Sequence, residues 1–473
     1  MAARLNRHIV LVGFMAAGKS TLGAEAARRT GFLFHDLDES MEHAVGDIAT
    51  FFREHGEPAF RELEEAETLW ALVESPPSVI ALGGGAVTSS AVREGLRIRA
   101  ITVWLDVDVD TCWERAQGSG RPLAQDETEF RRLYEERRPL YAAAADAVAR
   151  DVDDVVLAAA GVHVERGALS RLGELVPGDG PVALVSDAHV AGIHGMDAQL
   201  ALGPRLAEMH ELPPGEEAKT LAAVDRLWQD FRLDRRGTVV ALGGGCTTDA
   251  AGWAASAYLR GIAWVPVPSS LVAQVDAAIG GKTGIDLPQG KNLVGSFHWP
   301  ARTVIDPALL GTLPEPQRRE GMSEAVKTGL LAGEPVWELP DDELVRRCAA
   351  FKAAVCLRDP RDEGERAILN LGHTFAHALE AAAGYEGVTH GRAVALGLLA
   401  ALRLSGRDIG QVEEILRPTP VHVDRERAWQ AMQRDKKAIG GELRLVLLGD
   451  DGPRWNVPVP ADDVRRALNE LIA

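Results

Sequence analysis

Short apolar runs alternate with amphipathic segments over the first third of the chain. Residues 8–13 (HIVLVG), 78–82 and 101–105 are strongly apolar, and each run is bounded by polar or glycine residues, which predicts buried strands. Helical patterns follow, at about 19–29 and 127–149. Strand and helix in alternation predict a parallel sheet with helices on both faces.

A second alternating region begins near residue 162, with strands expected at 182–186, 238–242 and 264–267. From about residue 309 strand signals fade, and helical patterns dominate up to one late strand candidate at 443–448. We therefore expect three parts: an α/β domain at 1–158, an α/β subdomain at 159–308 and a mainly helical subdomain at 309–473. The acidic, Ala-rich stretch 151–161 is interpreted as a linker without a rigid docking element.

Composition excludes several classes of protein. The 473 residues are 46% hydrophobic and 25% charged, which is ordinary for globular domains. The net charge of −18 is opposite in sign to that of a generic nucleic-acid binder, so we expect no nucleic-acid partner. No apolar run reaches the length of a membrane span, so we expect no membrane partner either. Four scattered cysteines without a CxxC pair indicate a cytoplasmic, reducing compartment. The apolar run 9–17 superficially resembles a signal peptide, but it ends in Gly-Lys-Ser-Thr rather than a cleavage site.

That same run leads into a phosphate-binding motif. Residues 13–20 (GFMAAGKS) fit G-x-x-x-x-G-K-[ST] between a predicted strand and a predicted helix. Backbone N–H groups of such a loop cradle phosphates, Lys19 reaches the β- and γ-phosphates, and the Ser20 hydroxyl suits Mg²⁺. A chance glycine turn is the alternative. The expected nucleotide-binding residues are Gly13, Ala16, Ala17, Gly18, Lys19, Ser20 and Thr21.

Five further motifs follow in the first domain. They are Asp36-Leu-Asp38, Phe60-Arg61-Glu-Leu-Glu64, Gly83-Gly84-Gly85, and the arginine pair of Arg121-Pro-Leu and Arg137-Arg-Pro-Leu-Tyr141. Arginines with an aspartate around a glycine turn could hold a small hydroxylated carboxylate, because Arg binds carboxylates in bidentate fashion and Asp accepts from hydroxyls. Taken singly, each residue is better explained as a solvated surface charge.

In this order the motifs resemble the shikimate kinase family over about residues 5–155. The resemblance implies that shikimate is bound by Asp38, Arg61, Gly84 and Arg137. It implies that Arg121, on a lid, contacts ATP and the transferred phosphoryl group, and that Asp36 is a Mg²⁺-side or base-like catalytic residue beside Lys19. One departure is Ala16, where the family commonly has glycine; alanine should be tolerated unless the position needs a positive φ.

The second region contains another glycine turn. Gly243-Gly244-Gly245 follows a predicted strand and precedes a helix, which suits a dinucleotide pyrophosphate, although it is not G-x-G-x-x-G and a structural turn explains it as well. Residues 214–219 and Asp187 could supply ribose and adenine contacts. Lys282 and Lys291 stand in Gly-rich sequence of low charge, which suggests binding of a phosphate or carboxylate.

Glutamate and histidines suggest a metal site further on. Glu324 and Lys327 share a helical face, and His373 and His377 are four residues apart, a spacing that could ligate one zinc ion but is also common on polar helix faces. A third histidine, His390, lies within eighteen residues of the first. Three histidines and an upstream glutamate favour a metal site.

Together these features resemble the 3-dehydroquinate synthase family over about residues 162–450. The resemblance implies that Glu324, His373 and His390 ligate Zn²⁺ or Co²⁺, whereas His377 touches substrate. It implies NAD⁺ contacts at Asp187, Glu216, Lys219, Gly243, Gly244, Gly245, Asp249, Ser269, Ser270, Lys282 and Lys291. It implies substrate contacts at Arg260, Asp276, Lys282, Lys291, Asn292, Lys327, Lys352, Arg366, His377 and Lys436, with Lys437 as the alternative to Lys436. Lys282, Lys327 and His377 are the expected catalytic groups of this half.

The sequence thus predicts an α/β fold: a P-loop kinase domain, a Rossmann-like subdomain and a helical metal-binding subdomain. The resemblances imply a cytoplasmic bifunctional enzyme that phosphorylates shikimate with MgATP and cyclises 3-deoxy-D-arabino-heptulosonate 7-phosphate to 3-dehydroquinate with NAD⁺ and a metal. A homodimer through the synthase half is expected. Two alternatives remain: the second half is another sugar-phosphate cyclase or a metal-dependent polyol dehydrogenase, or the chain is a catalytically inactive nucleotide sensor.

Overall fold

The computed structural model describes residues 6–74, 76–117, 122–384, 386–435 and 442–473. The chain divides into two compact units, residues 1–161 and residues 162–473, with the boundary after Gly161. No helix in the described ranges is long and apolar enough to cross a membrane.

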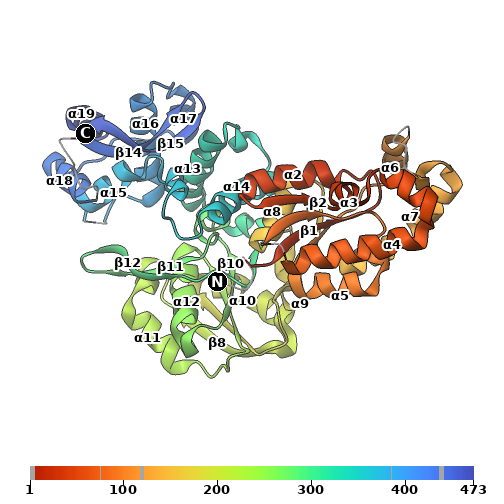
Figure 1. Ribbon diagram of the computed structural model, residues 1–473. Coiled ribbons are helices and arrows are strands. Elements are labelled where there is room, and N and C mark those ends of the chain that lie inside the picture. The colour runs from red at the N-terminus through yellow and green to blue at the C-terminus, as the bar shows by residue number, and fades with distance from the viewer. Residues whose placement is uncertain (1–5, 75, 118–121, 385, 436–441) are drawn as a thin grey trace. The chain divides into compact units, whose positions relative to one another are not determined.

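The first unit is a five-stranded parallel sheet in the order β2-β3-β1-β4-β5. Its strands are β1 (His8–Val12), β2 (Leu33–Asp36), β3 (Ser78–Ala81), β4 (Ala100–Leu105) and β5 (Ala147–Ala149). Its helices are α2 (Lys19–Thr30), α3 (Leu37–Val45), α4 (Ile48–Glu74), α5 (Ser90–Arg99), α6 (Val109–Ala116), α7 (Glu127–Ala144) and α8 (Val152–Ala160). Helices α2 and α8 pack together on one face of the sheet, and α4 and α5 pack together on the other (Figure 1). The predicted parallel sheet covered on both faces is confirmed.

Central strands of this sheet are buried on both sides, which explains their continuous apolar sequence. Every residue of β1, β3 and β4 is buried, and β1 pairs in parallel with both β3 and β4. A parallel strand covered on both faces has no solvent side, so its side chains do not alternate between apolar and polar. Because β1 is central, the loop that follows it lies at the carboxyl edge of the sheet, where α/β proteins bind their ligands.

Two predictions about the end of this unit are wrong. The helix expected at 127–149 ends at Ala144, and Ala147–Ala149 form the edge strand β5 beside β4. The stretch 151–161, expected to be a linker, contains the helix α8, all but one of whose residues are buried. The Asp151 side chain caps it by accepting from the N–H groups of Asp153 and Asp154, and Arg29 of α2 pairs with Asp153 at 2.7 Å.

The second unit begins with an α/β layer. Its strands are β6 (Val162–Val164), β7 (Val182–Asp187), β8 (Leu206–Leu212), β9 (Thr238–Gly243), β10 (Ala263–Pro268), β11 (Lys282–Leu287), β12 (Gly290–Phe297) and β13 (Thr303–Ile305). Strands β10-β9-β7-β8 form a parallel sheet, β11 and β12 form an antiparallel hairpin, and β13 pairs with β6. The helices of this layer are α9 (Leu172–Leu175), α10 (Ala188–Leu202), α11 (Leu221–Asp230) and α12 (Gly245–Ala257). The Rossmann-like expectation is confirmed.

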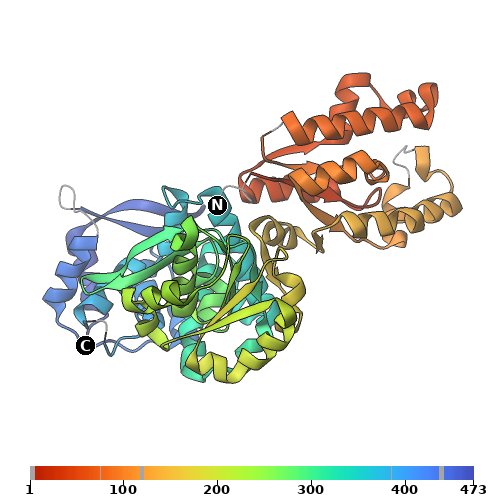
Figure 2. The same ribbon diagram turned by 90° about the horizontal axis from the view of Figure 1, so that it is seen from below.

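The remainder of this unit is mainly helical. Its helices are α13 (Glu315–Ala332), α14 (Asp341–Arg358), α15 (His373–Ala382), α16 (His390–Leu404), α17 (Gly410–Leu416), α18 (Arg425–Asp435) and α19 (Ala461–Asn469). Strands β14 (Glu442–Gly449) and β15 (Gly452–Pro460) form a hairpin; β14 was expected and β15 was not. Figure 2 shows this unit from below, with the blue helical part beside the green α/β layer. The separate boundary expected at residue 308 stays a prediction.

Candidate active sites

A cavity of about 480 Å³ lies at the carboxyl edge of the first sheet, over the loop after β1. Lys19, the first residue of α2, is buried, and its Nζ donates to the carbonyl oxygens of Gly13 and Phe14, each at 2.9 Å. The lysine is therefore held across the loop that a phosphate would enter. Ser20 and Thr21 line the same cavity. This is the geometry that a phosphate-binding loop requires.

Position 16 does need a positive φ. Ala16 lies at φ 59, and the loop also contains Gly13 at φ 151 and Gly18 at φ 96. An L-residue in the left-handed region costs roughly 1–2 kcal/mol, so the alanine stores strain that glycine at this position would not. Alanine at position 16 was expected to be tolerated only if the backbone there did not need a positive φ, and the structure shows a positive φ.

Enlarging this side chain tests the strain. Ala16→Val should lower kinase turnover more than tenfold, because a β-branched residue at positive φ is a conformational outlier and would force the loop to rearrange. Ala16→Gly, the matched control, should leave turnover within about twofold, since it only removes the strain. Steady-state ADP formation measures both; equal activity of the two variants would show that the left-handed conformation is not required.

Acidic and basic groups face each other on the far side of the cavity. Arg61 of α4 pairs with Glu64 at 2.5 Å and with Glu57 at 3.1 Å. Glu64 is buried; burial raises the pKa of its carboxyl, and Arg61 opposes that rise. A Cβ at Gly83 would meet the Glu64 carboxylate and a Cβ at Gly85 would meet the Arg61 guanidinium, so a side chain at either position would displace this ion pair. All three guanidinium nitrogens of Arg61 thus donate to Glu57 or Glu64 beside the glycine turn.

The glycine turn is held from α7. The Gly84 carbonyl accepts from Tyr141 Oη at 2.5 Å and from Arg137 Nη1 at 3.4 Å. Arg137 is 5% exposed, and burial lowers its pKa. Asp36 caps α3 by accepting from Asp38 N at 3.0 Å. The structure thus brings Asp36, Asp38, Arg61, Gly84 and Arg137 to one cavity.

The sequence analysis did not single out two charged residues of the cavity, Glu64 and Arg115, or Tyr141, which holds the glycine turn. Glu64 and Tyr141 stood inside motifs singled out for their arginines, and Arg115 of α6 lines the cavity without any motif. Arg121, expected on a lid, lies outside the described residues, so its predicted contact with ATP stays a prediction.

The second glycine turn links β9 to α12. Asp187, at the end of β7, caps α10 with Oδ1, and its Oδ2 accepts from Thr247 Oγ1 at 3.1 Å. The Ser269 N–H donates to the Gly243 carbonyl at 2.9 Å, and a Cβ on Gly244 would lie 3.5 Å from Ser270 Oγ. The end of three adjacent strands, one helix N-terminus and two serines therefore surround this turn, as a pyrophosphate site requires.

Ion pairs extend from this turn to the β11–β12 hairpin. Lys219 is buried, pairs with Asp249 at 2.8 Å and hydrogen-bonds Asn292. Burial would lower the pKa of Lys219, but the Asp249 carboxylate raises it above the ordinary value. Lys291 of the hairpin pairs with Glu216 at 2.8 Å. Predicted cofactor and substrate contacts are thus joined in one network.

A buried cluster of charges lies beside it. Asp276 Oδ2 is 2.8 Å from Lys352 Nζ, and Asp276 Oδ1 is 3.4 Å from Lys327 Nζ. Burial lowers the pKa of Lys352, whereas Asp276 and Glu324 outweigh burial and raise that of Lys327. Arg366 is 2% exposed, and its Nε has no hydrogen-bond partner among the described residues. Buried charges require partners of opposite sign, so these cations favour the binding of an anionic ligand.

Three remaining predicted residues behave differently. Lys282 pairs with Asp362 at 2.5 Å on the rim of this region. Arg260 is exposed in the turn after α12 at φ 67, and within the described ranges no hydrogen bond or ion pair joins it to the cluster. Lys436 and the alternative Lys437 lie outside the described residues. The substrate contacts of these residues stay predictions.

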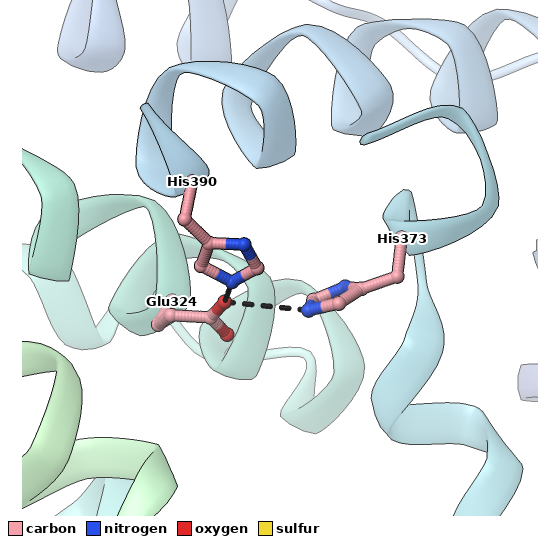
Figure 3. A group of neighbouring side chains, drawn as sticks. All are labelled: Glu324, His373 and His390. Atoms are coloured by element: carbon pink, nitrogen blue, oxygen red, sulfur yellow. Dashed lines mark ion pairs between the residues drawn. The ribbon is translucent and has the colours of Figure 1, made fainter. Parts of the chain in front are cut away.

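Glu324, His373 and His390 converge from three helices (Figure 3). Their potential ligand atoms all lie within 4.8 Å of one another, and Glu324 Oε1 is 3.4 Å from His373 Nε2 and 3.3 Å from His390 Nε2. The other oxygen, Oε2, lies 2.5 Å from Lys327 Nζ without hydrogen-bond geometry. A buried carboxylate facing two imidazole nitrogens is a donor set that suits Zn²⁺ or Co²⁺ with open positions.

The far nitrogens of both imidazoles have partners that orient the rings. His373 Nδ1 lies 3.2 Å from the Leu371 carbonyl, which can only accept, so the neutral ring carries its proton on Nδ1 and offers Nε2. His390 Nδ1 lies 3.5 Å from Glu380 Oε1. Burial would lower the pKa of His390, but the carboxylates of Glu324 and Glu380 outweigh burial and raise it to about 10. Because a histidine ligand must offer a deprotonated nitrogen, metal binding at His390 would compete with protons.

His377 stands apart from this group. Its ring centroid is 5.7 Å from that of His373, one turn away on α15, but the described cluster does not include it. The i,i+4 spacing alone therefore pointed to a different pair from the one that the structure gathers. Glu380, the partner of His390, was missed, because a glutamate in a helix carries no sequence signal of this role.

Known proteins match both units. The family model of shikimate kinase matches residues 15–161, and the models of the N-terminal and C-terminal parts of 3-dehydroquinate synthase match residues 209–320 and 321–438. The 3-dehydroquinate synthase of Bordetella pertussis is 38% identical over 340 residues, which cover 65% of this chain and 95% of that protein. The chain belongs to the 3-dehydroquinate synthase family. It carries a shikimate kinase domain in front of the synthase domain.

Further relatives agree. The 3-dehydroquinate synthase of Gloeobacter violaceus is 41% identical over 346 residues, 66% of this chain and 96% of that protein. A crystal structure of 2-deoxy-scyllo-inosose synthase with carbaglucose-6-phosphate, NAD⁺ and Co²⁺ is 27% identical with a TM-score of 0.59, covering 65% of this chain and 96% of that one. A 2-epi-5-epi-valiolone synthase from Streptomyces hygroscopicus with NAD⁺ and Zn²⁺ is 25% identical with a TM-score of 0.57, covering 66% and 96%. The predicted kinase–synthase fusion is confirmed.

Proposed function

We propose that the chain catalyses two reactions: phosphorylation of shikimate by MgATP in the first unit, and cyclisation of 3-deoxy-D-arabino-heptulosonate 7-phosphate to 3-dehydroquinate in the second. The observation that carries the synthase assignment is the convergence of Glu324, His373 and His390 beside the buried cations of the Asp276 cluster. The cations fit a substrate with a carboxylate and a phosphate, which a neutral polyol lacks. The higher identity to 3-dehydroquinate synthases than to other cyclases favours the same substrate.

In the kinase half the residues position the two substrates and neutralise the charge of the phosphates, and none of them forms a covalent bond to substrate. Lys19 and the loop N–H groups hold the transferred phosphoryl group, and Ser20 would hold Mg²⁺, which neutralises the phosphates when bound. Arg61 and Arg137 are placed to bind the shikimate carboxylate, and Asp38 accepts from its hydroxyls. Asp36 is fixed by the start of α3 at the metal side of the cavity.

Kinase specificity offers a direct test of these contacts. Asp38→Ala and Arg137→Ala should lower kcat/KM for shikimate by about 10²-fold or more, because each leaves a buried polar partner unpaired. Wild-type enzyme should reject analogues that lack the carboxylate or a ring hydroxyl by a comparable factor. Steady-state kinetics with both analogues checks this; equal turnover of shikimate and a carboxylate-free analogue would contradict it.

In the synthase half the chain would bind NAD⁺ at Asp187, Glu216, Lys219 and the turn Gly243–Gly245. When bound, NAD⁺ would withdraw and return a hydride at one ring carbinol, and the metal held by Glu324, His373 and His390 would polarise the oxygen of that carbon. The surrounding residues orient the substrate and move protons. Lys327 lies between the carboxylates of Glu324 and Asp276, where its Nζ can stabilise a developing oxyanion. Lys352, Arg366 and Asn292 hold the anionic groups, and His377, one helical turn from His373, is placed to contact substrate.

One assay tests both halves of this assignment. Phosphate release from the heptulosonate phosphate should require NAD⁺ and stop with a chelator, without net formation of NADH. ADP formation with shikimate should require only MgATP. Net NADH formation would identify a dehydrogenase, and binding of both nucleotides without turnover would identify an inactive sensor.

The proposal also includes an oligomeric state and a cellular location. We expect a homodimer through the second unit, and Ile193, Met196 and Leu200 support it, because they form an exposed apolar row on α10 that a second copy would cover. Sedimentation velocity of the full chain measures this. A cytoplasmic location fits the four cysteines, which are all free thiols.

A further inference from the structure

The helix that brings His390 to the metal group starts in an unusual way. Thr389 is the N-cap of α16, but its side chain does not cap the helix. An N-cap threonine ordinarily accepts from a backbone N–H one turn inside the helix and so satisfies one of the orphan donors there. Here the Thr389 hydroxyl instead donates to Glu320 of α13 at 2.5 Å.

Glu320 supplies the missing cap. Its Oε2 accepts from the Gly391 N–H at 2.5 Å, while its Oε1 accepts from Thr389. One carboxylate thus binds the residues on both sides of His390. A carboxylate at a helix N-terminus is also favoured by the partial positive charge of that end.

Close approach of the two helices depends on Gly391. A Cβ at this position would lie 2.6 Å from the Glu320 carbonyl oxygen, too close for any real contact. Helices α13 and α16 therefore meet backbone to backbone at the start of α16. This leaves His390 little freedom to move away from α13.

The same helix α13 carries Glu324, one turn after Glu320. Residues four apart lie on one face of a helix, so both carboxylates point toward the start of α16. Glu324 Oε1 is 3.3 Å from His390 Nε2, and Glu320 holds the backbone on either side of that histidine. Neither the sequence motifs nor the proposed ligand set includes Glu320.

We propose that Glu320 is a positioning residue for the metal site, which caps helix α16 from α13 and thereby fixes His390 at its distance from Glu324. The proposal rests on the proposed function, because it takes His390 to be a metal ligand. In this proposal Glu320 is not a ligand of the ion. It restricts the positions that the His390 ring can adopt before the metal binds. Its loss should therefore weaken metal binding, while the loaded site remains chemically intact.

The test measures Zn²⁺ affinity of the full chain by competition with a chromophoric chelator. Glu320→Ala should weaken Zn²⁺ binding by about 10–100-fold, the range found when partners of metal ligands are removed. Glu320→Gln should retain most of the affinity, because its amide oxygen can still accept from Gly391. Glu315→Ala is the matched control on the same helix, since Glu315 is exposed and pairs with Arg319 of its own turn; it should bind Zn²⁺ like the wild type.

A second readout separates positioning from general loss of structure. The visible spectrum of bound Co²⁺ should change in Glu320→Ala and return toward that of the wild type in Glu320→Gln. At saturating Zn²⁺, cyclisation by Glu320→Ala should recover to within about twofold of wild type. If Glu320→Ala does not fold by circular dichroism, Thr389→Val removes one of the two bonds at similar volume and should weaken Zn²⁺ binding by several-fold.

The Zn²⁺ affinities of the variants test the positioning role of Glu320 and the ligand role of His390 separately. Wild-type Zn²⁺ affinity in folded Glu320→Ala, or in Thr389→Val, would overturn the positioning role. Wild-type Zn²⁺ affinity in His390→Ala would instead overturn the ligand set of the proposed function. Loss of Zn²⁺ in His390→Ala together with unchanged affinity in Glu320→Ala leaves the proposed function standing and this inference refuted.

Discussion

Replacing His390 with alanine should remove the bound metal and abolish cyclisation, whereas replacing His377 with alanine should leave the metal in place. The physical reason is the direction of the ring nitrogens. His373 Nε2 and His390 Nε2 both face Glu324 Oε1, at 3.4 Å and 3.3 Å, so the three donors can close on one ion. A three-ligand site that loses an imidazole must replace it with water, and the affinity falls accordingly.

The measurement is metal content per chain after exhaustive dialysis, followed by phosphate release from the heptulosonate phosphate. His377→Ala should keep its metal but turn over slowly, because it loses a substrate contact rather than a ligand. His210→Ala is a suitable control, since this histidine pairs with Glu208 on β8, away from the described metal group. Metal loss in His377→Ala with retention in His390→Ala would reverse the assignment.

The sequence predicted those parts of the fold in which local pattern and tertiary environment agree. Strands β1, β4 and β9 are buried on both faces, and a continuous apolar run is the expected signature of such strands. Strand β15 was missed because its sequence, GPRWNVPVP, contains three prolines, which are usually excluded from strand interiors. It is tolerated because the hairpin of β14 and β15 is two-stranded and leaves one edge of β15 unpaired within it.

Helix α8 was misread for a different reason. Acidic residues followed by alanines look like a linker by composition, but Asp151 is an N-cap and the acidic first turn of α8 complements the helix dipole. The same letters therefore carried a helix-start signal. What they did not carry is the partner surface on α2, which buries the helix.

The candidate site shows where local sequence information ends. Lys19 and the loop around it follow from a motif whose residues are contiguous. The set of Glu324, His373 and His390 spans three helices, and its members came from family resemblance, while the i,i+4 spacing favoured His377. Glu380 contacts the His390 ring and Glu320 binds the neighbouring Gly391 N–H because α13 and α15 pack against α16, and no spacing within one helix reveals such contacts.

Lys19→Ala should remove kinase activity and leave cyclisation within about twofold, and Glu324→Gln should do the reverse. Lys19 Nζ is fixed on the phosphate loop, and loss of one such charge donor costs about 10²–10³-fold in turnover. Glu324→Gln keeps the size of the side chain but removes the negative charge that a cation requires, so cyclisation should stop.

The reason to expect that the two active sites work independently is chemical. The product 3-dehydroquinate must still lose water and be reduced before it becomes shikimate, so a channel between the two sites would have nothing to carry.

Residues 152–160 add a structural reason. Helix α8 packs on α2 and is tied to it by the pair of Arg29 and Asp153, so the end of the first unit belongs to the core of that unit. Both activities measured on both variants, with circular dichroism as the folding control, decide the question. A tenfold loss in the distant reaction would mean a coupling free energy above about 1 kcal/mol and would refute independence.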